Sequence, residues 1–274
     1  MPWQWPVGAL FAFVLAVMST PAGVSGAVLL LPLQLSVLHV PSPAVTPTNL
    51  LFNVAATPGG LLRFWQENRL RGPLTRVLVL GTLPGVIGGA VIRVELLSGT
   101  DAFELVAAGV LLPLGLWLLL GAQRLPPSQR ELTVRARAWI WILSLVVGTL
   151  GGIYGIGGGS ILAPILLASG FSAYEVAPAT LTATFLTSLV GIATYQVLQL
   201  AHGGAIAPQW ILGVWLGAGG FLGSYLGARL QRHLPERSIR RLLGLIACLI
   251  AARYIQDGTR HHPTSESRPA VIAH

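Results

Sequence analysis

The sequence predicts an all-α integral membrane protein, a polytopic helical bundle built from two inverted repeats, and three observations support this fold class. Hydrophobic residues make up 53% of the 274 residues and charged residues only 9%, whereas a soluble domain carries about 25% charged residues. The basic residues, all of them arginine, cluster in short loops between apolar segments, a pattern typical of cytoplasmic loops. Glycine-rich blocks recur in the same order in both halves. These observations exclude an ordinary soluble enzyme, because a chain of this length cannot bury so much apolar surface in an aqueous core.

The first repeat is expected to comprise residues 1–122. Its opening segment, Met1 to Val24, ends in a stretch that resembles a signal-peptide cleavage region but has no positively charged start, so we interpret it as the first membrane element. The apolar segments of this half run approximately over residues 7–20, 26–38, 43–62, 74–92 and 102–120. The first two are shorter than the ~20 residues that cross a bilayer, so they predict a broken, re-entrant hairpin. The other three predict full transmembrane helices.

The remainder of the chain is expected to follow the same plan. A basic cytoplasmic linker at 123–137 precedes the second repeat, 138–256, and residues 257–274 predict a disordered tail because they are polar and lack periodicity. The apolar segments are 138–150, 160–169, 175–200, 208–228 and 239–255. The first two would give helices of only about 20 and 15 Å, which again predicts a hairpin interrupted by the glycine run 151–160.

Three blocks of the first half align with blocks of the second, with a spacing that grows from about 131 to 136 residues as loop insertions would make it. The pairs are Gly23–Pro32 with Gly155–Pro164, Val45–Leu50 with Val176–Leu181, and Gly85–Gly88 with Gly220–Gly223. Small residues recur by chance in any membrane helix. The preserved order nevertheless favours a duplication.

Arginine placement predicts that the two repeats have opposite topology. Residues 63–76 and 124–137 each contain four arginines and 229–241 contain five, whereas 200–208 contain none. Because basic loops stay in the cytoplasm, the equivalent loops 63–76 and 200–208 should lie on opposite faces, as inverted repeats require. We therefore expect six full spans plus two hairpins, with both termini outside.

Each hairpin predicts half of a binding site near the middle of the membrane. The second half-helix begins at Ser25 and Gly26 in the first copy, and at Gly157, Gly158, Gly159 and Ser160 in the second. Helix N-termini present N–H groups without intrahelical partners and carry a partial positive charge, and glycine lets an oxyanion approach those amides closely. The alternative is that the glycines serve only close helix packing.

The helix after each hairpin adds uncharged polar side chains to this candidate site. Asn49 and Asn53 in the first copy, like Thr180 and Thr184 in the second, are four residues apart and share a helical face. Their donors could complete the shell of an oxyanion. The alternative is that the threonines bond to their own helix and the asparagines join helices together. No buried acid or base is evident along the spans, so a carboxylate proton relay is not predicted.

The block Gly155-Ile-Gly-Gly-Gly-Ser-Ile-Leu-Ala-Pro164, its degenerate copy ending at Pro32 and the glycine-rich third element of each half resemble the sulfite exporter TauE/SafE family of membrane permeases. The likeness covers roughly residues 8–255. It implies a multi-pass protein of the bacterial inner membrane that moves sulfite, sulfoacetate, another organosulfur compound or a related small anion. It also implies binding positions at Gly157, Gly158, Gly159 and Ser160, with Ser25 and Gly26 in the other half.

The favoured interpretation is a permease that alternates access to a midplane site. An anion channel of the same architecture and a non-transporting membrane scaffold or assembly protein are the alternatives. We expect no enzymatic activity, catalytic residue, metal site or cofactor, and the lone Cys248 excludes a disulfide within the chain. The expected partners are a small anion and the lipid bilayer but no nucleic acid, and self-association into a homo-oligomer is left open.

Overall fold

The computed structural model describes residues 4–97, 132–203 and 206–231, with further residues scattered through 108–120 and 241–256. All regular structure in these parts is helical, which confirms the all-α fold class. The elements are α1 (Gln4–Ser19), the 3-10 turn η1 (Thr20–Ala22), α2 (Ala27–Ser36), α3 (Ser42–Gln66), α4 (Pro73–Glu95), α6 (Val134–Tyr154), α7 (Gly158–Ala168), α8 (Ala173–His202) and α9 (Trp210–Leu230). Within the described residues, five helical stretches are long and apolar enough to cross a membrane: Trp5–Ala22, Pro73–Glu95, Val134–Tyr154, Tyr174–His202 and Trp210–Leu230.

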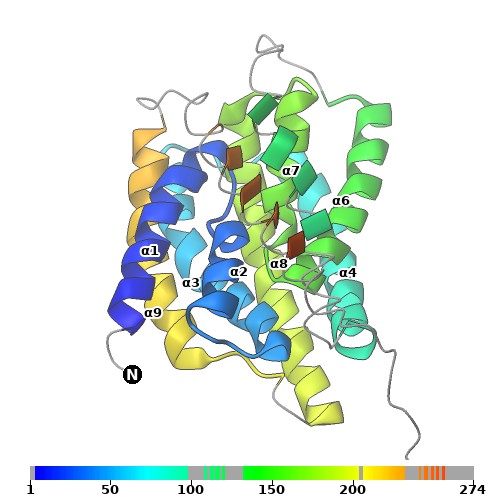
Figure 1. The fold of residues 1–274 in the computed structure, drawn as a ribbon. Coiled ribbons are helices and arrows are strands. Elements are labelled where there is room, and N and C mark those ends of the chain that lie inside the picture. The colour runs from blue at the N-terminus through cyan, green and yellow to red at the C-terminus, as the bar shows by residue number, and fades with distance from the viewer. Residues whose placement is uncertain are drawn as a thin grey trace, which may run out of the picture.

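The helices form two groups, and each group takes one helix from the other half of the sequence (Figure 1). Helix α9, from the second half, packs along α1 and α3, whereas α4, from the first half, packs along α6 and α8. Helices α3 and α8 contact each other where the groups meet. The two halves are therefore interlocked rather than separate.

Small residues make this close packing possible. A Cβ added at Gly85 of α4 would lie 2.3 Å from the Leu145 carbonyl oxygen of α6, and one at Gly219 of α9 would lie 1.9 Å from the Ala9 carbonyl oxygen of α1. The backbones thus approach as closely as in other membrane bundles with small interfacial residues. Successive glycines of α4 contact successively later residues of α6, and successive glycines of α9 contact successively later residues of α1. The two helices of each pair therefore run parallel.

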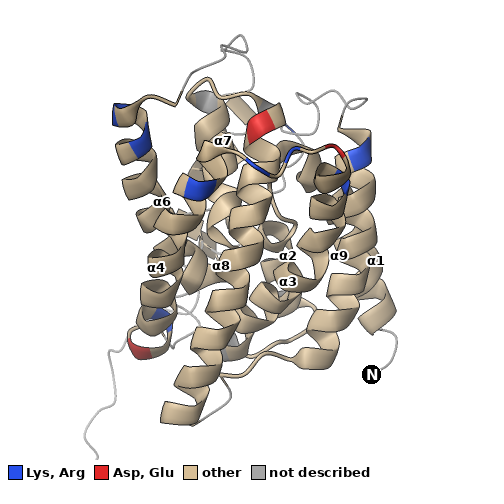
Figure 2. Cartoon of the chain, turned by 180° about the vertical axis from the view of Figure 1, so that it is seen from behind, with Lys and Arg blue, Asp and Glu red and all other residues tan. Residues whose placement is uncertain are grey.

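Charge divides the bundle into two ends. The basic end is where α3 finishes and α4, α6 and α8 begin, and most of the described arginines gather there (Figure 2). At the opposite end, called the neutral end here, α4 and α8 finish and His202 pairs with Glu95 at 2.8 Å. By the positive-inside rule, the basic end is expected to face the cytoplasm.

Each half contains a broken helix pair that starts and finishes at the same end of the bundle, and the two pairs point in opposite directions. The first arm of each pair was expected to be too short to cross a bilayer, but Trp5–Ala22 and Val134–Tyr154 are both long enough to do so, so re-entry into the membrane stays a prediction. The first hairpin, α1–η1–α2, starts at the neutral end beside α9 and returns there, since a Cβ at Gly8 would lie 3.8 Å from the Leu38 side chain. The second hairpin, α6–α7, starts and finishes at the basic end, where Leu132 and Phe171 line one pocket with Arg69. The inverted relation between complete halves stays a prediction, because it also depends on the spans expected at 102–120 and 239–255.

One expectation about the second hairpin is wrong. Its first arm was predicted to end at Leu150 and to be about 20 Å long, but α6 runs from Val134 to Tyr154 over 21 residues, which is about 31 Å. Gly151 and Gly152 remain helical because α6 packs along α4, where a Cβ at Gly152 would lie 2.4 Å from the Val86 carbonyl oxygen. Tertiary packing offsets the low helix propensity of glycine here.

Several predictions lie outside the described residues. They are most of the span at 102–120, the linker up to residue 131, most of the basic loop 229–241, most of the span at 239–255 and the tail 257–274.

The orientation of the two ends can be checked by cysteine labelling. In a Cys248→Ser background, single cysteines replacing the exposed residues Arg71 at the basic end and His202 at the neutral end should react with an impermeant maleimide from opposite sides of the membrane. We expect this result because arginine-rich loops stay on the cytoplasmic side of the membrane, which places the basic end there. Labelling of both positions from the same side would contradict the arrangement.

Candidate functional site

Both hairpins break at glycines that have a left-handed backbone. Gly23 ends η1 with φ +74°, and Gly155 ends α6 with φ +70°, the conformation that glycine adopts at little cost after a helix. These two glycines are the first residues of the matched sequence blocks. In each hairpin the chain then runs a few residues without helix before α2 or α7 begins.

The starts of α2 and α7 meet inside the bundle. The Ser25 N–H donates to Ser160 Oγ at 3.1 Å, and Ser160 Oγ donates to the Ile156 carbonyl at 3.0 Å. Both serines are buried, with exposures of 4% and 0%. The two helix N-termini that the sequence predicted as halves of one site are therefore in direct contact.

Asn53 joins the two hairpins. Ser25 Oγ donates to Asn53 Oδ1, and Asn53 Nδ2 donates to the Gly155 carbonyl at 3.2 Å. The side chain is fully buried and lies near the middle of α3. A single amide thus fixes the turn of the second hairpin against the start of α2.

Asn49, one turn earlier on α3, has a more local role. Its Nδ2 donates to the Ala27 carbonyl at 3.0 Å, and its Oδ1 accepts from Gln34 Nε2 at 3.0 Å. These partners belong to α2, so Asn49 joins α2 to α3 within the first repeat. On the other side, Thr180 Oγ1 donates to the Gly23 carbonyl at 2.9 Å as well as to its own helix at Val176.

The predicted glycines differ in what surrounds them. A Cβ at Gly157 would lie 2.6 Å from Thr184 Cγ2, and one at Gly159 would lie 1.9 Å from the Thr180 carbonyl oxygen, so packing against α8 by itself requires glycine at both positions. At Gly158 the obstacle is the Thr82 side chain of α4, at 2.7 Å. Gly26 differs, because its nearest neighbour, Ala16 N, would be 3.4 Å away, an ordinary contact.

Two buried hydroxyls of α8 have no hydrogen bond within the described residues. Thr184 Oγ1 and Ser188 Oγ are fully buried and have no partner there. They are four residues apart and share a face of α8, and Thr184 Oγ1 would lie 2.5 Å from a Cβ at Gly159. Because an unmade hydrogen bond costs roughly 1–3 kcal/mol when buried, these donors are candidates for binding a ligand.

A small cavity lies against the start of α2. It is lined by Thr20, Ser25, Gly26, Thr57 and Ser224 together with apolar side chains of α1, α3 and α8, and its volume is about 10 Å³, room for roughly one water molecule. Neither Thr57 nor Ser224 was predicted from the sequence as a site residue. Their positions in the sequence could have identified them, because Thr57 follows Asn53 by one helical turn and Ser224 lies next to the matched glycine Gly223.

Comparison with known proteins decides the family. The model of the family described as sulfite exporter TauE/SafE matches residues 8–254. The chain belongs to the TauE/SafE family. It is also 27% identical over 250 residues to a probable membrane transporter protein of Xylella fastidiosa, an alignment that covers 89% of this chain and 90% of the relative. A probable membrane transporter protein of Bacillus subtilis, YunE, is 29% identical over 117 residues, which cover 42% of this chain and 40% of that protein. No solved structure matches.

This TauE/SafE chain is therefore a multi-pass membrane permease, as the resemblance implied. The matched region includes every predicted site residue. The match says nothing about which of these residues bind a substrate, so their assignment stays a prediction.

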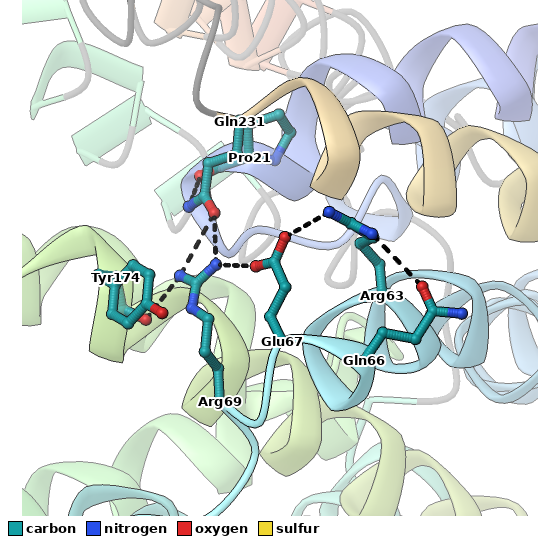
Figure 3. A network of polar contacts seen from close by, with 7 residues as sticks. All are labelled: Pro21, Arg63, Gln66, Glu67, Arg69, Tyr174 and Gln231. Atoms are coloured by element: carbon teal, nitrogen blue, oxygen red, sulfur yellow. Dashed lines mark hydrogen bonds and ion pairs between the residues drawn. The ribbon is translucent and has the colours of Figure 1, made fainter.

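At the basic end of the TauE/SafE bundle, Arg69 ties four elements together (Figure 3). Its guanidinium donates to Glu67 at 2.8 Å and to the Tyr174 carbonyl at 2.7 Å, and it lies 3.5 Å from the centre of the Tyr174 ring. It also reaches Gln231 Oε1 at 3.4 Å, and Gln231 Nε2 donates to the Pro21 carbonyl at 2.8 Å. The loop after α3, the start of α8, the residue after α9 and the turn of the first hairpin are thereby joined.

The acidic member of this network is held in its charged form. Burial by itself raises the pKa of the Glu67 carboxyl, but hydrogen bonds and positive charge from Arg69 and Arg63 outweigh burial and hold that pKa below its usual value. Arg63 contributes an ion pair of 2.7 Å. The network is thus intact at neutral pH and is expected to weaken only in acid, once the carboxyl is protonated.

A larger pocket opens beside this network. Its volume is about 750 Å³, and it is lined by the loop after α3, residue 132 and the start of α8, including Arg69, Arg71, Thr75, Ser172 and Glu175. Because both ends of the second hairpin reach this pocket, it forms a polar vestibule at the basic end. Arg69 lines this vestibule, and its network extends through Gln231 to Pro21, the residue after Thr20 of the small cavity at α2.

Proposed function

We propose that this TauE/SafE protein is a permease for a small anion, in the class of sulfite, sulfoacetate and related organosulfur compounds, in a bacterial inner membrane. The proposed site lies where the N-termini of α2 and α7 meet, among Ser25, Gly26, Asn49, Asn53, Gly157, Gly158, Gly159, Ser160, Thr180 and Thr184. The observation that carries the proposal is the direct hydrogen bond from the Ser25 N–H to Ser160 Oγ, beside which Asn53 joins Ser25 to the Gly155 carbonyl.

The chemistry of this site suits an oxyanion. Two converging helix N-termini together contribute roughly one positive charge, and Ser25, Ser160, Thr184 and Asn53 bring buried hydroxyl and amide groups to the same place. Desolvation makes such a site selective, because an anion must exchange its water for several donors at once. No lysine is needed, and the sequence contains none.

Alternating access is supported by the exchanged packing of the two groups of helices. Helix α4 packs on α6 and α8, and its matched counterpart α9 packs on α1 and α3, which is the relation that the repeats 1–122 and 138–256 would produce. The hairpins open toward opposite ends, and the cavity at the start of α2 is small, about 10 Å³. We interpret this as an occluded state, with the Arg69 network closing the basic end.

Thr184 provides a direct test of the site. Thr184→Val removes a hydroxyl that has no hydrogen bond in the described protein while keeping its shape, so thermal stability should stay the same or rise. In proteoliposomes loaded with sulfite, sulfate or sulfoacetate, the variant should raise the KM for the transported anion about tenfold, the effect expected from one lost hydrogen bond to a charged group.

Thr194→Val is the matched control, because Thr194 lies on the same helix and its hydroxyl bonds to its own backbone at Val190. This control should transport like the wild type. Saturable counterflow would favour a carrier, and passive anion current without exchange would favour the channel alternative. If the wild-type protein carried no anion flux, the result would contradict a transport function and favour the non-transporting scaffold or assembly protein.

A further inference from the structure

Helix α3 contains three consecutive residues that weaken a helix. Pro58 has no backbone N–H, so the carbonyl four residues earlier cannot receive its regular helical hydrogen bond. Gly59 and Gly60 follow directly, and proline and glycine have the two lowest helix propensities. The backbone of α3 is therefore weakest at this point, which lies between Asn53 of the proposed site and the basic end.

A side chain of α9 bonds to the backbone of α3 at the same place. Ser224 Oγ donates to the Ala56 carbonyl at 2.6 Å and accepts from the Gly60 N–H at 3.0 Å. Ser224 is buried, with an exposure of 3%. In a regular α-helix a carbonyl and an N–H four residues apart bond to each other. One hydroxyl of α9 is thus bonded to both ends of the backbone step that contains Pro58 and Gly59, and a side chain that inserts into this ladder is one of the causes of a helix kink.

The Ser224 hydroxyl also has an acceptor in its own helix. The Phe221 carbonyl lies 3.1 Å from Ser224 Oγ, so the hydroxyl proton has a partner whether or not α3 stays in place. Once α3 moves away, the Gly60 N–H and the Ala56 carbonyl can bond to each other. These buried groups therefore keep a hydrogen bond in both arrangements. The free-energy difference between the arrangements is small because no polar group is left unpaired.

This step of α3 also borders the proposed site. Ala56, Thr57 and Ser224 line the small cavity at the start of α2, together with Ser25 and Gly26. A change in the α3 backbone here therefore changes the space beside the N-terminus of α2.

We propose that α3 bends at residues 56–60, called the hinge here, during transport and that Ser224 is the positioning residue that holds the hinge in its closed arrangement. Bending moves the end of α3 and the loop after it relative to Asn53 and the start of α2. This movement draws Arg69 away from Gln231, which it contacts at 3.4 Å, and opens the basic end. The inference rests on the proposed function, because it supplies the moving part that alternating access requires.

The first test measures how readily the hinge exposes a neighbouring residue. In a Cys248→Ser background, Thr57→Cys places a thiol at a position that is 3% exposed and lines the cavity. The rate of its modification by an impermeant anionic methanethiosulfonate is measured from the basic side of membrane vesicles. Ser224→Ala should raise this rate roughly fivefold, because it removes bonds between α3 and α9 that only the closed arrangement makes. Pro58→Ala should lower the rate, because residue 58 then supplies an N–H and α3 resists bending.

The second test measures sulfite transport in proteoliposomes without the added cysteine. Pro58→Ala should lower kcat at least about tenfold while KM stays within about twofold of the wild type, and the Tm should stay the same or rise. The matched control is Pro84→Ala, which removes an exposed proline inside α4. Thr194→Val is the control for the lost hydroxyl, since Thr194 bonds to its own helix. Both controls should leave the labelling rate and kcat unchanged.

An unchanged labelling rate in either hinge variant, or no labelling of Thr57→Cys in any of them, would overturn the inference, and Ser224 would then serve only helix packing. If Ser224→Ala does not fold, Pro58→Ala decides, and a wild-type kcat together with a wild-type labelling rate for this variant overturns the hinge. A wild-type protein without anion flux would instead overturn the proposed function on which this inference rests.

Discussion

Replacing Asn53 by alanine is expected to abolish transport and to destabilise the protein strongly. The substitution leaves Ser25 Oγ and the Gly155 carbonyl without their shared partner inside the bundle. Unmade buried hydrogen bonds and the lost side-chain volume together cost roughly 2–4 kcal/mol. Transport should fall further than stability alone requires, because Asn53 links the two hairpins whose relative movement is proposed to expose the site. Sulfite flux in proteoliposomes and the thermal midpoint in detergent measure the two effects.

Asn49→Ala is the matched comparison, since Asn49 is also fully buried and lies one turn away on the same helix. Its hydrogen bonds stay between α2 and α3. We expect a comparable loss of stability but residual transport with a raised KM. Equal transport by the two variants at equal stability would show that the link between the hairpins has no special role.

Alanine substitutions at Gly159 and Gly26 should separate packing from binding. At Gly159 the new methyl group would lie 1.9 Å from the Thr180 carbonyl oxygen. The backbone of α8 cannot yield easily, so we expect a loss of more than about 3 kcal/mol and little folded protein. At Gly26, where φ is −59°, the methyl group meets only ordinary contacts. Gly26→Ala should therefore fold normally and lose transport, because a methyl group there limits the close approach of an oxyanion to the amides at the start of α2.

Expression yield, thermal midpoint and anion flux are the measurements for this pair. Gly158→Ala would not separate the two effects, since its methyl group would meet the Thr82 side chain at 2.7 Å. Normal transport by a normally folded Gly26→Ala variant would remove Gly26 from the proposed site and favour the packing explanation for all these glycines.

The sequence predicted the broken helices and the residues at their ends, because each matched glycine block separates two apolar segments that are both shorter than the ~20 residues needed to cross a bilayer. Gly23 and Gly155, matched from the sequence alone, have nearly identical φ angles. The length of α6 was not predictable in the same way. Gly151 and Gly152 look like the start of the break, and only the contact with α4 keeps them helical.

The hydrogen-bond partners of the buried polar side chains could not be predicted from the sequence either. Asn49 and Asn53 have the same residue type and the same helical face, yet one joins neighbouring elements and the other joins the two hairpins. Neither Ser188 nor Arg93 was predicted to be buried, since a lone serine, or an arginine near a helix end, is common in membrane helices that expose it. Both side chains are buried in the structure. Their burial depends on which helices pack around them, and the sequence does not show this.

Composition, apolar segment lengths and the repeated glycine blocks by themselves determined that this chain is a helical membrane protein with two interrupted hairpins, because the bilayer tolerates few other solutions. The tertiary structure decided which helix ends converge, which glycines are required by packing and where a buried positive charge lies. The physical reason is that these properties arise from contacts between residues more than a hundred positions apart, such as Ser25 with Ser160. Local sequence patterns carry no information about the relative placement of such residues.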